Sequence, residues 1–393
     1  MTQPLSIKTP ELKMPLVADD LTAEWLNLVL QPILGNVKII GFESEIIGVG
    51  AGFLGQLARL SLRLDSEDPV VPQTVVAKFA STKPETREFA REQNYYTREI
   101  GFYRDIGQDV GIKVPLCYFS EHLPESNHFV ILLQDLAPAL ASDQVKGTGV
   151  EDSIRVIETF ATLHAIWWNS ERLESYDWAQ PMVNAMPIAQ GLEMLNRSIQ
   201  TAEETGCFDQ YPEMKRLMLL LPPICKLEPP PPFPFTLSHG DCRSDNIFYP
   251  SAEGGEFAVI DWQLSGMGQP MTDISRWLVQ SISIDQRRET EQDLLKLYHQ
   301  KLVENGVTGY SYKTMMQEYK LNLVVILFMF SMGLEDIDQT PERAQALFHQ
   351  MYSRLDAALV DWEVVKILKV LPYLVPFLKM SVWFKRKFAR TAS

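Results

Sequence analysis

The chain has 393 residues, of which 46% are hydrophobic and 22% are charged, which is typical of a globular enzyme large enough for two lobes. Its 36 basic and 50 acidic residues give a formal net charge of -14, which argues against general nucleic-acid binding because that function needs a basic surface. The N-terminus lacks the basic-then-apolar profile of a signal peptide. The cysteines are too scattered for a zinc site or a disulfide framework, so we expect a reducing, cytoplasmic location. They are Cys117, Cys207, Cys225 and Cys242.

The first 36 residues predict an N-terminal extension that contains one short helix. Prolines interrupt residues 1–18, which we expect to be irregular. The helix is predicted from apolar residues at helical spacing, followed by a proline and a glycine that end it. These residues are Leu21, Trp25, Leu28, Val29, Pro32 and Gly35.

Three apolar runs rich in β-branched residues then predict an antiparallel sheet. They cover residues 37–47, 56–64 and 74–79. The segment between the first two, residues 48–55, is rich in glycine. Such a segment allows backbone N–H groups to approach a phosphate, and a plain glycine hairpin turn is the alternative interpretation.

Residues 86–105 predict one helix with Tyr96, Ile100 and Tyr103 on its apolar face. Apolar strands are predicted from Val114 onward and at residues 129–133. A polar linker, three helical regions and a stiff proline-rich spacer are predicted after them. In chain order these are the linker 142–149, the helix 150–168, the Met- and Leu-rich helical region 180–226, the spacer 229–234 and the helical region 285–393.

The stretch 238–262 carries the chemistry. Asp241 is followed five residues later by Asn246, and a short apolar run ends at Asp261. Phosphoryl transfer needs one group to orient the attacking hydroxyl and accept its proton, and hard oxygen ligands to hold Mg²⁺. Asp241 suits the first task, and Asn246 with Asp261 suits the second.

The order His-Gly-Asp, then Asn, then Ile-Asp-Trp resembles the aminoglycoside phosphotransferase and choline kinase superfamily, which has a protein-kinase-like fold. Asp261-Trp262-Gln263 departs from the Asp-Phe-Gly of protein kinases, which argues against a protein kinase. The Glu-x-x-Phe-Tyr that begins at Glu99 and the Leu-His-Ala-x-Trp around His164 favour the ecdysteroid-kinase-like branch.

This resemblance covers about residues 40–285 and implies an α+β, bilobal fold. It places an N-terminal lobe with an antiparallel sheet at residues 37–138 and a mainly helical lobe at residues 139–393. The implied activity is ATP- and Mg²⁺-dependent transfer of a phosphoryl group to a hydroxyl of a small-molecule acceptor. No obligatory protein partner is implied.

The resemblance also assigns residues to nucleotide binding. Backbone groups of Gly50 and Gly52 would approach the phosphates, and Lys78 would hold them, with Glu99 as its ion-pair partner. Glu92 is the rival partner, and a solvent-facing Lys78 is the alternative. Backbone groups between Gln134 and Leu136, in the hinge between the lobes, would bind adenine.

Further residues of the second lobe receive secondary assignments. Arg243 would steady the migrating phosphoryl charge, and Asp245 is expected to be a solvated or loop-capping acid. Asp273 resembles the family aspartate that braces the catalytic loop, and we expect it to act as a helix N-cap. His164 is expected to be a hydrogen-bonded core histidine rather than a base. Trp167 and its neighbour Trp168 are expected to line either a cavity or the core.

The C-terminal region leaves alternatives open. The apolar stretch 321–334 is shorter than the ~18–20 residues that span a bilayer, so we expect a buried helix. The acidic residues that follow, at 335–338, either attract an amine or form a loop. The basic tail 364–390 allows membrane contact, but Pro372 and Pro376 interrupt it, and docking on the second lobe is favoured. A pseudokinase-like binding module is the alternative to an enzyme, and a peripheral lipid kinase is a third hypothesis.

Overall fold

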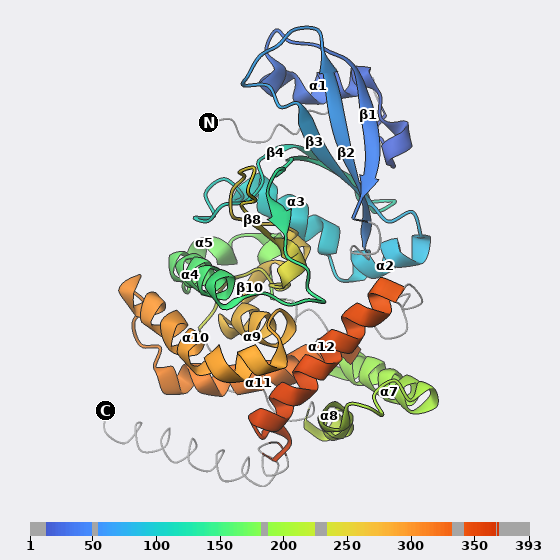
Figure 1. Cartoon of the computed structure of the whole chain (residues 1–393). Coiled ribbons are helices and arrows are strands. Elements are labelled where there is room, and N and C mark those ends of the chain that lie inside the picture. Colours follow the sequence, from blue (N-terminus) through green and yellow to red (C-terminus); the bar gives the residue numbers. More distant parts are fainter. Residues whose placement is uncertain are drawn as a thin grey trace, which may run out of the picture.

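The computed structural model describes residues 13–48, 54–181, 188–224, 234–331, 342–366 and 368. A small lobe built on a sheet stands above a larger helical lobe (Figure 1). The sheet has five antiparallel strands in the order β1-β2-β3-β5-β4. Their bounds are β1 Ile39–Ile47, β2 Gly55–Leu64, β3 Thr74–Ala80, β4 Cys117–Leu123 and β5 His128–Gln134. The predicted antiparallel sheet is therefore confirmed.

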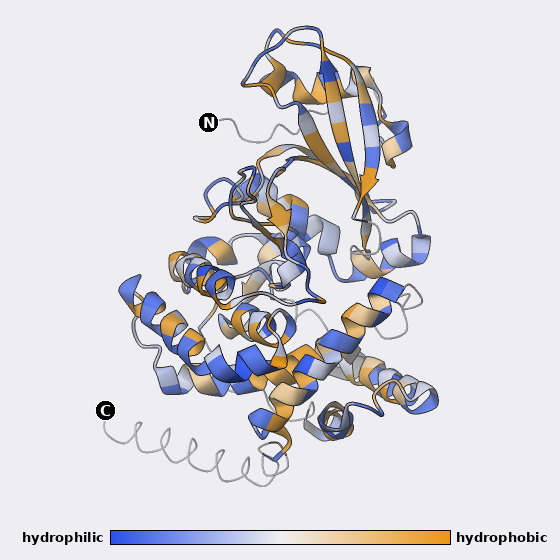
Figure 2. Ribbon diagram, in the orientation of Figure 1, coloured by the Kyte–Doolittle hydropathy of each residue, from blue (hydrophilic) through white to orange (hydrophobic). Residues whose placement is uncertain are grey.

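The sheet lies between two helices because its central strands are buried on both faces. Val130 and Leu132 of β5 belong to the apolar cluster that contains α1, whereas Phe129 and Ile131 belong to the cluster that contains α3. Side chains alternate between the faces of a strand, so Lys78 of β3 lies on the face opposite to its buried neighbours Ala77 and Phe79. Along β2, hydrophobic and hydrophilic residues alternate (Figure 2).

The helix α1 (Ala23–Leu34) covers the outer face of the sheet. The Thr22 hydroxyl caps it by accepting the N–H of Trp25 at 3.1 Å. Pro32 lies inside the helix, contrary to prediction, and Gly35 with φ 59° ends it. Leu28 remains 37% exposed and is therefore not part of the buried face.

The predicted single helix at residues 86–105 is wrong, because the structure has two helices there. They are α2 (Pro84–Glu92) and α3 (Tyr95–Asp105). Asn94 adopts a left-handed conformation with φ 58°, and asparagine is among the few residues that tolerate it. This break lets α3 turn and bury nearly its whole surface beneath the sheet.

The C-terminal lobe surrounds α9 (Met271–Gln280), which packs against α4, α10, α11 and α12. The helix predicted at residues 150–168 is present as α4 (Val150–Ile166). The described part of the stretch 321–334, which was predicted to be a buried helix, forms the end of α11 (Tyr312–Ser331). No helix in the described part of the chain is long and apolar enough to cross a membrane. The predicted spacer at 229–232, the acidic residues 335–338 and the basic tail beyond 368 lie outside the described residues.

The remaining elements complete this lobe and the segments that join it to the sheet. The longer helices are α4 Val150–Ile166, α7 Ile188–Thr205, α8 Pro212–Ile224, α10 Ile284–Glu304, α11 Tyr312–Ser331 and α12 Glu342–Asp361. The short helices are η1 Ala18–Asp20, α5 Glu171–Glu174, η2 Asp177–Ala179, η3 Ser244–Asn246 and η4 Trp262–Leu264. The short strands are β6 Leu140–Ala141, β7 Thr236–Ser238, β8 Ile247–Tyr249, β9 Ala258–Val259 and β10 Gly266–Gly268.

Asn27 fastens α1 to the sheet. Its Nδ2 donates to the carbonyl of Ile39 at 2.7 Å, and its Oδ1 accepts the N–H of Ile39 at 2.9 Å. Both backbone groups at the start of β1 therefore depend on one side chain.

We expect Asn27→Ala to lower the free energy of unfolding by about 1–3 kcal/mol, because it leaves both backbone groups of Ile39 without these bonds. Urea denaturation of wild type and variant measures this difference. Gln31→Ala, at an exposed position of the same helix, serves as the control and should change stability by less than about 0.5 kcal/mol. Equal losses in the two variants would contradict the prediction.

Candidate active site

The segment from β7 to β8 contains the predicted base Asp241 and is named the catalytic loop for that prediction. Asp273 of α9 holds it in place. The carboxylate of Asp273 accepts the N–H of His239 at 2.9 Å and the N–H of Gly240 at 2.8 Å. The expected brace is confirmed. The expected N-cap is wrong, because Asp273 is the third residue of α9 and Pro270 occupies the N-cap.

A glycine is required at position 240. Gly240 has φ 78°, and a Cβ atom there would lie 2.4 Å from the carbonyl oxygen of Leu264. Only glycine combines this conformation with this close approach. The His-Gly-Asp motif thus reflects a backbone constraint as well as chemistry.

His164 supports Asp273 from the far side. It is fully buried, and its Nε2 lies 3.1 Å from Asp273 Oδ2 while its Nδ1 lies 2.6 Å from the Tyr298 hydroxyl. The expected core histidine is confirmed. Burial alone raises the pKa of Asp273, but its interactions with His164, His239 and the N–H of Gly240 together outweigh burial and lower it. Trp167 is buried as well, and its indole N–H donates to the carbonyl of Val110 at 3.1 Å.

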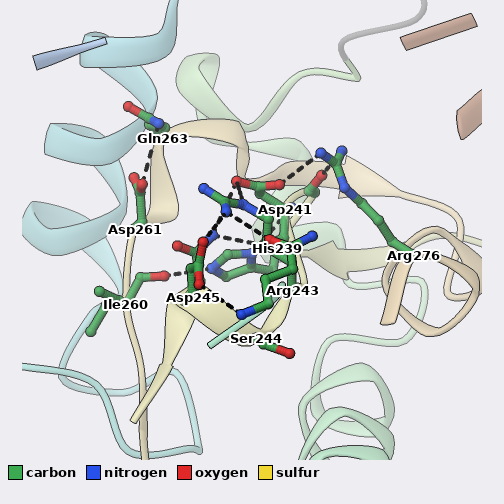
Figure 3. A network of polar contacts seen from close by, with 12 residues as sticks. His239, Asp241, Arg243, Ser244, Asp245, Ile260, Asp261, Gln263 and Arg276 are labelled. Carbon is green, nitrogen blue, oxygen red and sulfur yellow. Dashed lines mark hydrogen bonds and ion pairs between the residues drawn. The ribbon is translucent and has the colours of Figure 1, made fainter. Parts of the chain in front are cut away.

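Asp241 is surrounded by donors (Figure 3). Its Oδ2 accepts from Arg243 Nε at 3.1 Å and from Asn246 Nδ2 at 3.0 Å. Its Oδ1 forms an ion pair with Arg276 Nη2 at 2.7 Å. Burial alone raises the pKa of Asp241, but the guanidinium groups of Arg243 and Arg276 outweigh it and hold that pKa well below its usual value.

Asn246 faces Asp241 with its amide nitrogen. Besides the carboxylate, Nδ2 donates to the backbone carbonyl of Asp241 at 2.9 Å. These two bonds fix which way the amide points, and they leave its Oδ1 as the atom able to contact a cation. The expected metal-binding role of Asn246 is compatible with this orientation.

Asp261 connects the catalytic loop with the sheet. It has φ 64°, which is rare for a residue with a side chain and is typical of strained functional positions. Its Oδ1 lies 2.9 Å from Lys78 Nζ, and its Oδ2 accepts from Gln263 Nε2 at 3.3 Å. Its carboxylate is thereby oriented at both oxygens, and its side chain remains 21% exposed.

Lys78 reaches Glu99 as well as Asp261. The distance from Lys78 Nζ to the Glu99 carboxylate is 2.8 Å, and both side chains are buried. Glu92 is exposed at the end of α2, so the structure selects Glu99 and excludes a solvent-facing Lys78. Burial lowers the pKa of Lys78, but the carboxylates of Asp261 and Glu99 outweigh it and hold the pKa above its ordinary value. Burial raises the pKa of Glu99.

Aromatic stacking joins the residues after Asp261 to α3. Trp262 stacks on Phe102 with 3.9 Å between ring centroids and 6° between ring planes. The ring of His239 packs against Trp262 in an edge-type arrangement, with 4.7 Å between ring centroids. The Nδ1 of His239 accepts the N–H of Asp241, so its Nε2 carries the hydrogen and donates to the carbonyl of Ile260 at 2.8 Å. The catalytic loop and the Asp261 segment thus form one unit with α3.

Arg243 is held by an acid and an amide besides Asp241. Its Nη1 donates to Asp245 Oδ2 and to Gln144 Oε1, each at 2.9 Å. Asp245 is therefore not solvated, because this bond and the N–H of Gln144 at 3.2 Å occupy its two oxygens. Of the two roles expected for Asp245, the structure has the loop-capping one.

The nucleotide-binding residues predicted near the hinge are partly described. Gly50 and Gly52 lie outside the described residues. The N–H of Gln134 donates to the carbonyl of Leu116 at 2.8 Å, and the carbonyl of Leu136 accepts the N–H of Ala139 at 2.9 Å. The N–H of Leu136 has no partner in the described part of the chain, which leaves it able to bind a ligand. Adenine binding here stays a prediction.

Two arginines were missed by sequence reasoning. Arg98 of α3 is buried and donates to the carbonyls of Trp178 and Ser265 at 3.0 Å each. Arg276 of α9 is buried beside Asp241 and also donates to the carbonyl of Gly240 at 2.7 Å. Neither belongs to a motif with known spacing. The one available signal was an arginine on a helix face that is otherwise apolar.

The donor set suits a magnesium–nucleotide complex. Among the described residues, no cluster of three or more His, Cys, Asp or Glu side chains could hold a metal alone. Mg²⁺ bound with a nucleotide takes one or two protein carboxylates or amides and completes its octahedron with phosphates and water. Asp261 and the amide oxygen of Asn246 match this requirement.

Glu318 of α11 supports the start of α9. It is fully buried, and it accepts the N–H of Met271 at 2.9 Å and the hydroxyl of Tyr310 at 2.6 Å. Burial raises the pKa of Glu318 to about 7, although both hydrogen bonds act in the opposite direction. This acid titrates near neutrality without belonging to the reaction centre.

Comparison with known proteins gives one family and two kinds of relatives. The Ecdysteroid kinase-like family matches residues 49–307. The chain is similar to the "Uncharacterized oxidoreductase dhs-27" of Caenorhabditis elegans, with 21% identity over 404 residues that cover 93% of this chain and 49% of that protein. It shares 29% identity over 126 residues with "Acyl-CoA dehydrogenase family member 11" of Homo sapiens, covering 32% of this chain and 14% of that protein. The chain therefore spans at most about half the length of these curated relatives.

Among solved structures, the chain is similar to a putative aminoglycoside phosphotransferase of Ralstonia eutropha JMP134. The TM-score is 0.50 with 16% sequence identity, and the match covers 88% of this chain and 98% of that chain. At this identity the similarity shows the fold alone.

The pKa of Glu318 predicts a pH-dependent contribution to stability. Its folded pKa of about 7 lies above the unfolded value of about 4.3, so the folded state binds more protons between these values. Stability from this group is therefore full below about pH 4.3 and is lost as pH rises to about 7. At about 1.4 kcal/mol per pKa unit, this difference corresponds to a loss on the order of 4 kcal/mol.

Glu318→Gln tests this expectation, because the amide does not titrate. Urea denaturation at several pH values between 5 and 8 should show a smaller decline in the variant than in wild type. The difference between the two curves isolates Glu318 from other titrating groups such as Glu99. Parallel curves over this pH range would contradict the prediction.

Proposed function

Because this chain belongs to the ecdysteroid kinase-like family, we propose that it transfers the γ-phosphoryl group of Mg²⁺–ATP to a hydroxyl of a small molecule. The family match covers residues 49–307 and agrees with the expected branch. One observation supports the proposal most strongly. Lys78, Glu99 and Asp261 form one linked group, and Asp241 with Asn246 forms another.

The first group suits the nucleotide phosphates. The Lys78 ammonium is held by two carboxylates, so it cannot swing away and its charge is retained at any physiological pH. An ammonium in such a position interacts with phosphate oxygens, and Glu99 keeps its stem in place. Of the two carboxylates in this group, Asp261 is the more accessible to a ligand, because its side chain is 21% exposed whereas that of Glu99 is 1% exposed.

The second group suits the acceptor hydroxyl. In the proposed step the hydroxyl oxygen forms a bond to the γ-phosphorus while the bond from that phosphorus to the bridging oxygen breaks. The electron pair of the broken bond leaves with ADP, and the hydroxyl proton passes to the Asp241 carboxylate. Asp241 orients the hydroxyl, and Arg243 lies near enough to stabilise charge on the transferred group.

Asp261 and Asn246 would hold the magnesium ion, which neutralises phosphate charge when bound. Their two oxygen-bearing side chains approach from different segments, since Asn246 ends η3 and Asp261 follows β9. Asp241 keeps the Asn246 amide in the required orientation.

The oxidoreductase and dehydrogenase names belong to relatives that are at least about twice as long as this chain. We attribute the phosphotransferase site, and not those activities, to the segment shared with them. The acceptor class stays open, since a fold hosts many substrates. The scattered cysteines favour a cytoplasmic location.

Ligand-dependent stability tests the nucleotide site. A ligand that binds only the native state stabilises it by about 2.7 kcal/mol at a concentration one hundred times its Kd. We expect a rise in Tm that needs both Mg²⁺ and ATP and that disappears in Asp261→Ala. No rise at saturating ligand would contradict nucleotide binding.

Asp241→Asn distinguishes an enzyme from a binding module. The variant keeps the shape of the side chain but cannot accept a proton as a carboxylate does, so turnover should fall by about 10²–10⁴-fold. The Tm shift with Mg²⁺–ATP should persist. If wild type shows this shift but no ATP turnover with any hydroxylated metabolite, the protein is a pseudokinase-like module.

A further inference from the structure

Arg276 holds the catalytic loop from the side of α9. Its Nη2 lies 2.7 Å from Asp241 Oδ1, and its Nη1 donates to the carbonyl of Gly240 at 2.7 Å. Asp273, one turn earlier on the same helix, accepts the N–H of Gly240. One helix therefore grips Gly240 through both its N–H and its carbonyl, together with the side chain of Asp241.

The two oxygens of Asp241 are in different situations. Oδ1 is fully covered, and it has the ion pair with Arg276 but no well-directed hydrogen bond within the described residues. A reacting hydroxyl therefore has no path to Oδ1 while Arg276 is in place. Oδ2 accepts two hydrogen bonds, which occupy the two acceptor positions of a carboxylate oxygen. An incoming hydroxyl must replace one of these two donors.

Of those donors, Arg243 is the one that can be exchanged. Its bond to Oδ2 is the longer one, at 3.1 Å, and it keeps independent partners in Asp245 and Gln144. Asn246 is fixed at two points of Asp241, its carboxylate and its backbone carbonyl. Arg276 is likewise fixed at two points, both on the catalytic loop.

We propose that Arg276 is the positioning residue for Asp241: it fixes Oδ1 and the loop so that Oδ2 is presented to the acceptor hydroxyl when Arg243 is displaced. This inference rests on the proposed phosphotransferase function. Without Arg276, the Asp241 carboxylate would be held by Asn246 at Oδ2 alone and would be free to rotate as Arg243 departs. Arg276 acts through Asp241 and does not itself contact the reacting atoms.

A lysine cannot replace Arg276 in this role. The planar guanidinium reaches the carboxylate and the Gly240 carbonyl at once through separate N–H groups, whereas a lysine ammonium is a single point charge on a flexible stem. Arg276→Lys keeps the positive charge next to Asp241 and removes the two-point grip. It therefore separates positioning from simple charge compensation.

The test compares Arg276→Lys with Arg287→Lys. Arg287 of α10 is also buried and is also paired with carboxylates, Glu291 and Asp361, but it has no contact with the catalytic loop. Steady-state ATP turnover is measured for both variants and wild type, with water or an identified alcohol as acceptor. The Tm with and without Mg²⁺–ATP serves as the check on folding and nucleotide binding.

We expect kcat of Arg276→Lys to fall by about 10–100-fold, the usual consequence of a misplaced reacting group, with KM for ATP and the ligand-induced Tm shift unchanged. Arg287→Lys should have a lower Tm than wild type but a kcat within about twofold of wild type, because the change is structural and remote from Asp241. Partial recovery of Arg276→Ala by added guanidinium ion would support the assignment further.

Three results would overturn the inference. Arg276→Lys with wild-type kcat would show that the two-point grip is dispensable. Equal losses of kcat in the Arg276 and Arg287 variants would reduce Arg276 to a structural residue. A wild type that binds or turns over no ATP would remove the proposed function itself, and this inference with it, so the two failures are told apart by the wild-type measurement.

Discussion

The buried carboxylate of Asp273 is the interaction on which the reaction centre depends. It accepts two consecutive backbone N–H groups, from His239 and Gly240, in a place where no water could satisfy them. A buried carboxylate is stable only when its oxygens are hydrogen-bonded, and His164 of α4 adds a contact at 3.1 Å to the two backbone N–H groups. The turn that presents Asp241 is thus fixed from beneath by groups that never reach the reacting atoms.

The second constraint joins the two lobes. Lys78 belongs to the sheet, Glu99 to α3 and Asp261 to the segment after β9, so their contacts hold three separate parts of the chain together. The stack of Trp262 on Phe102 connects the same parts through apolar surface. The Lys78–Glu99 pair and the aromatic stack are buried, and the Lys78–Asp261 pair is partly buried, so loss of one partner in this low-dielectric environment is costly. In the proposed function, the alignment of the nucleotide and the acceptor therefore depends on contacts across the whole fold.

Sequence alone predicted the parts of this arrangement that are local. The alternation of the sheet and the spacing between Asp241 and Asn246 follow from short patterns, and the pairing of Lys78 with Glu99 was implied by the resemblance to the phosphotransferase superfamily. The break between two helices at Asn94 was not predicted, because apolar periodicity continues across it and one left-handed residue leaves almost no sequence signal. The partners of Arg98 lie 80 and 167 residues away, a separation that no local pattern encodes. Prediction therefore succeeded where chemistry is carried by a motif and failed where it is carried by packing.

The charge around Asp241 bears on the role of base that we propose for this residue. A carboxylate that must accept a proton would be strengthened by a raised pKa, yet two guanidinium groups hold the pKa of Asp241 low. Such an arrangement weakens the base and fixes its geometry. It suits a reaction in which bond breaking at phosphorus runs ahead of proton transfer, because the hydroxyl then needs alignment more than deprotonation. The structure favours a site that works by holding groups in line, and the arginines on both sides of Asp241 serve that alignment.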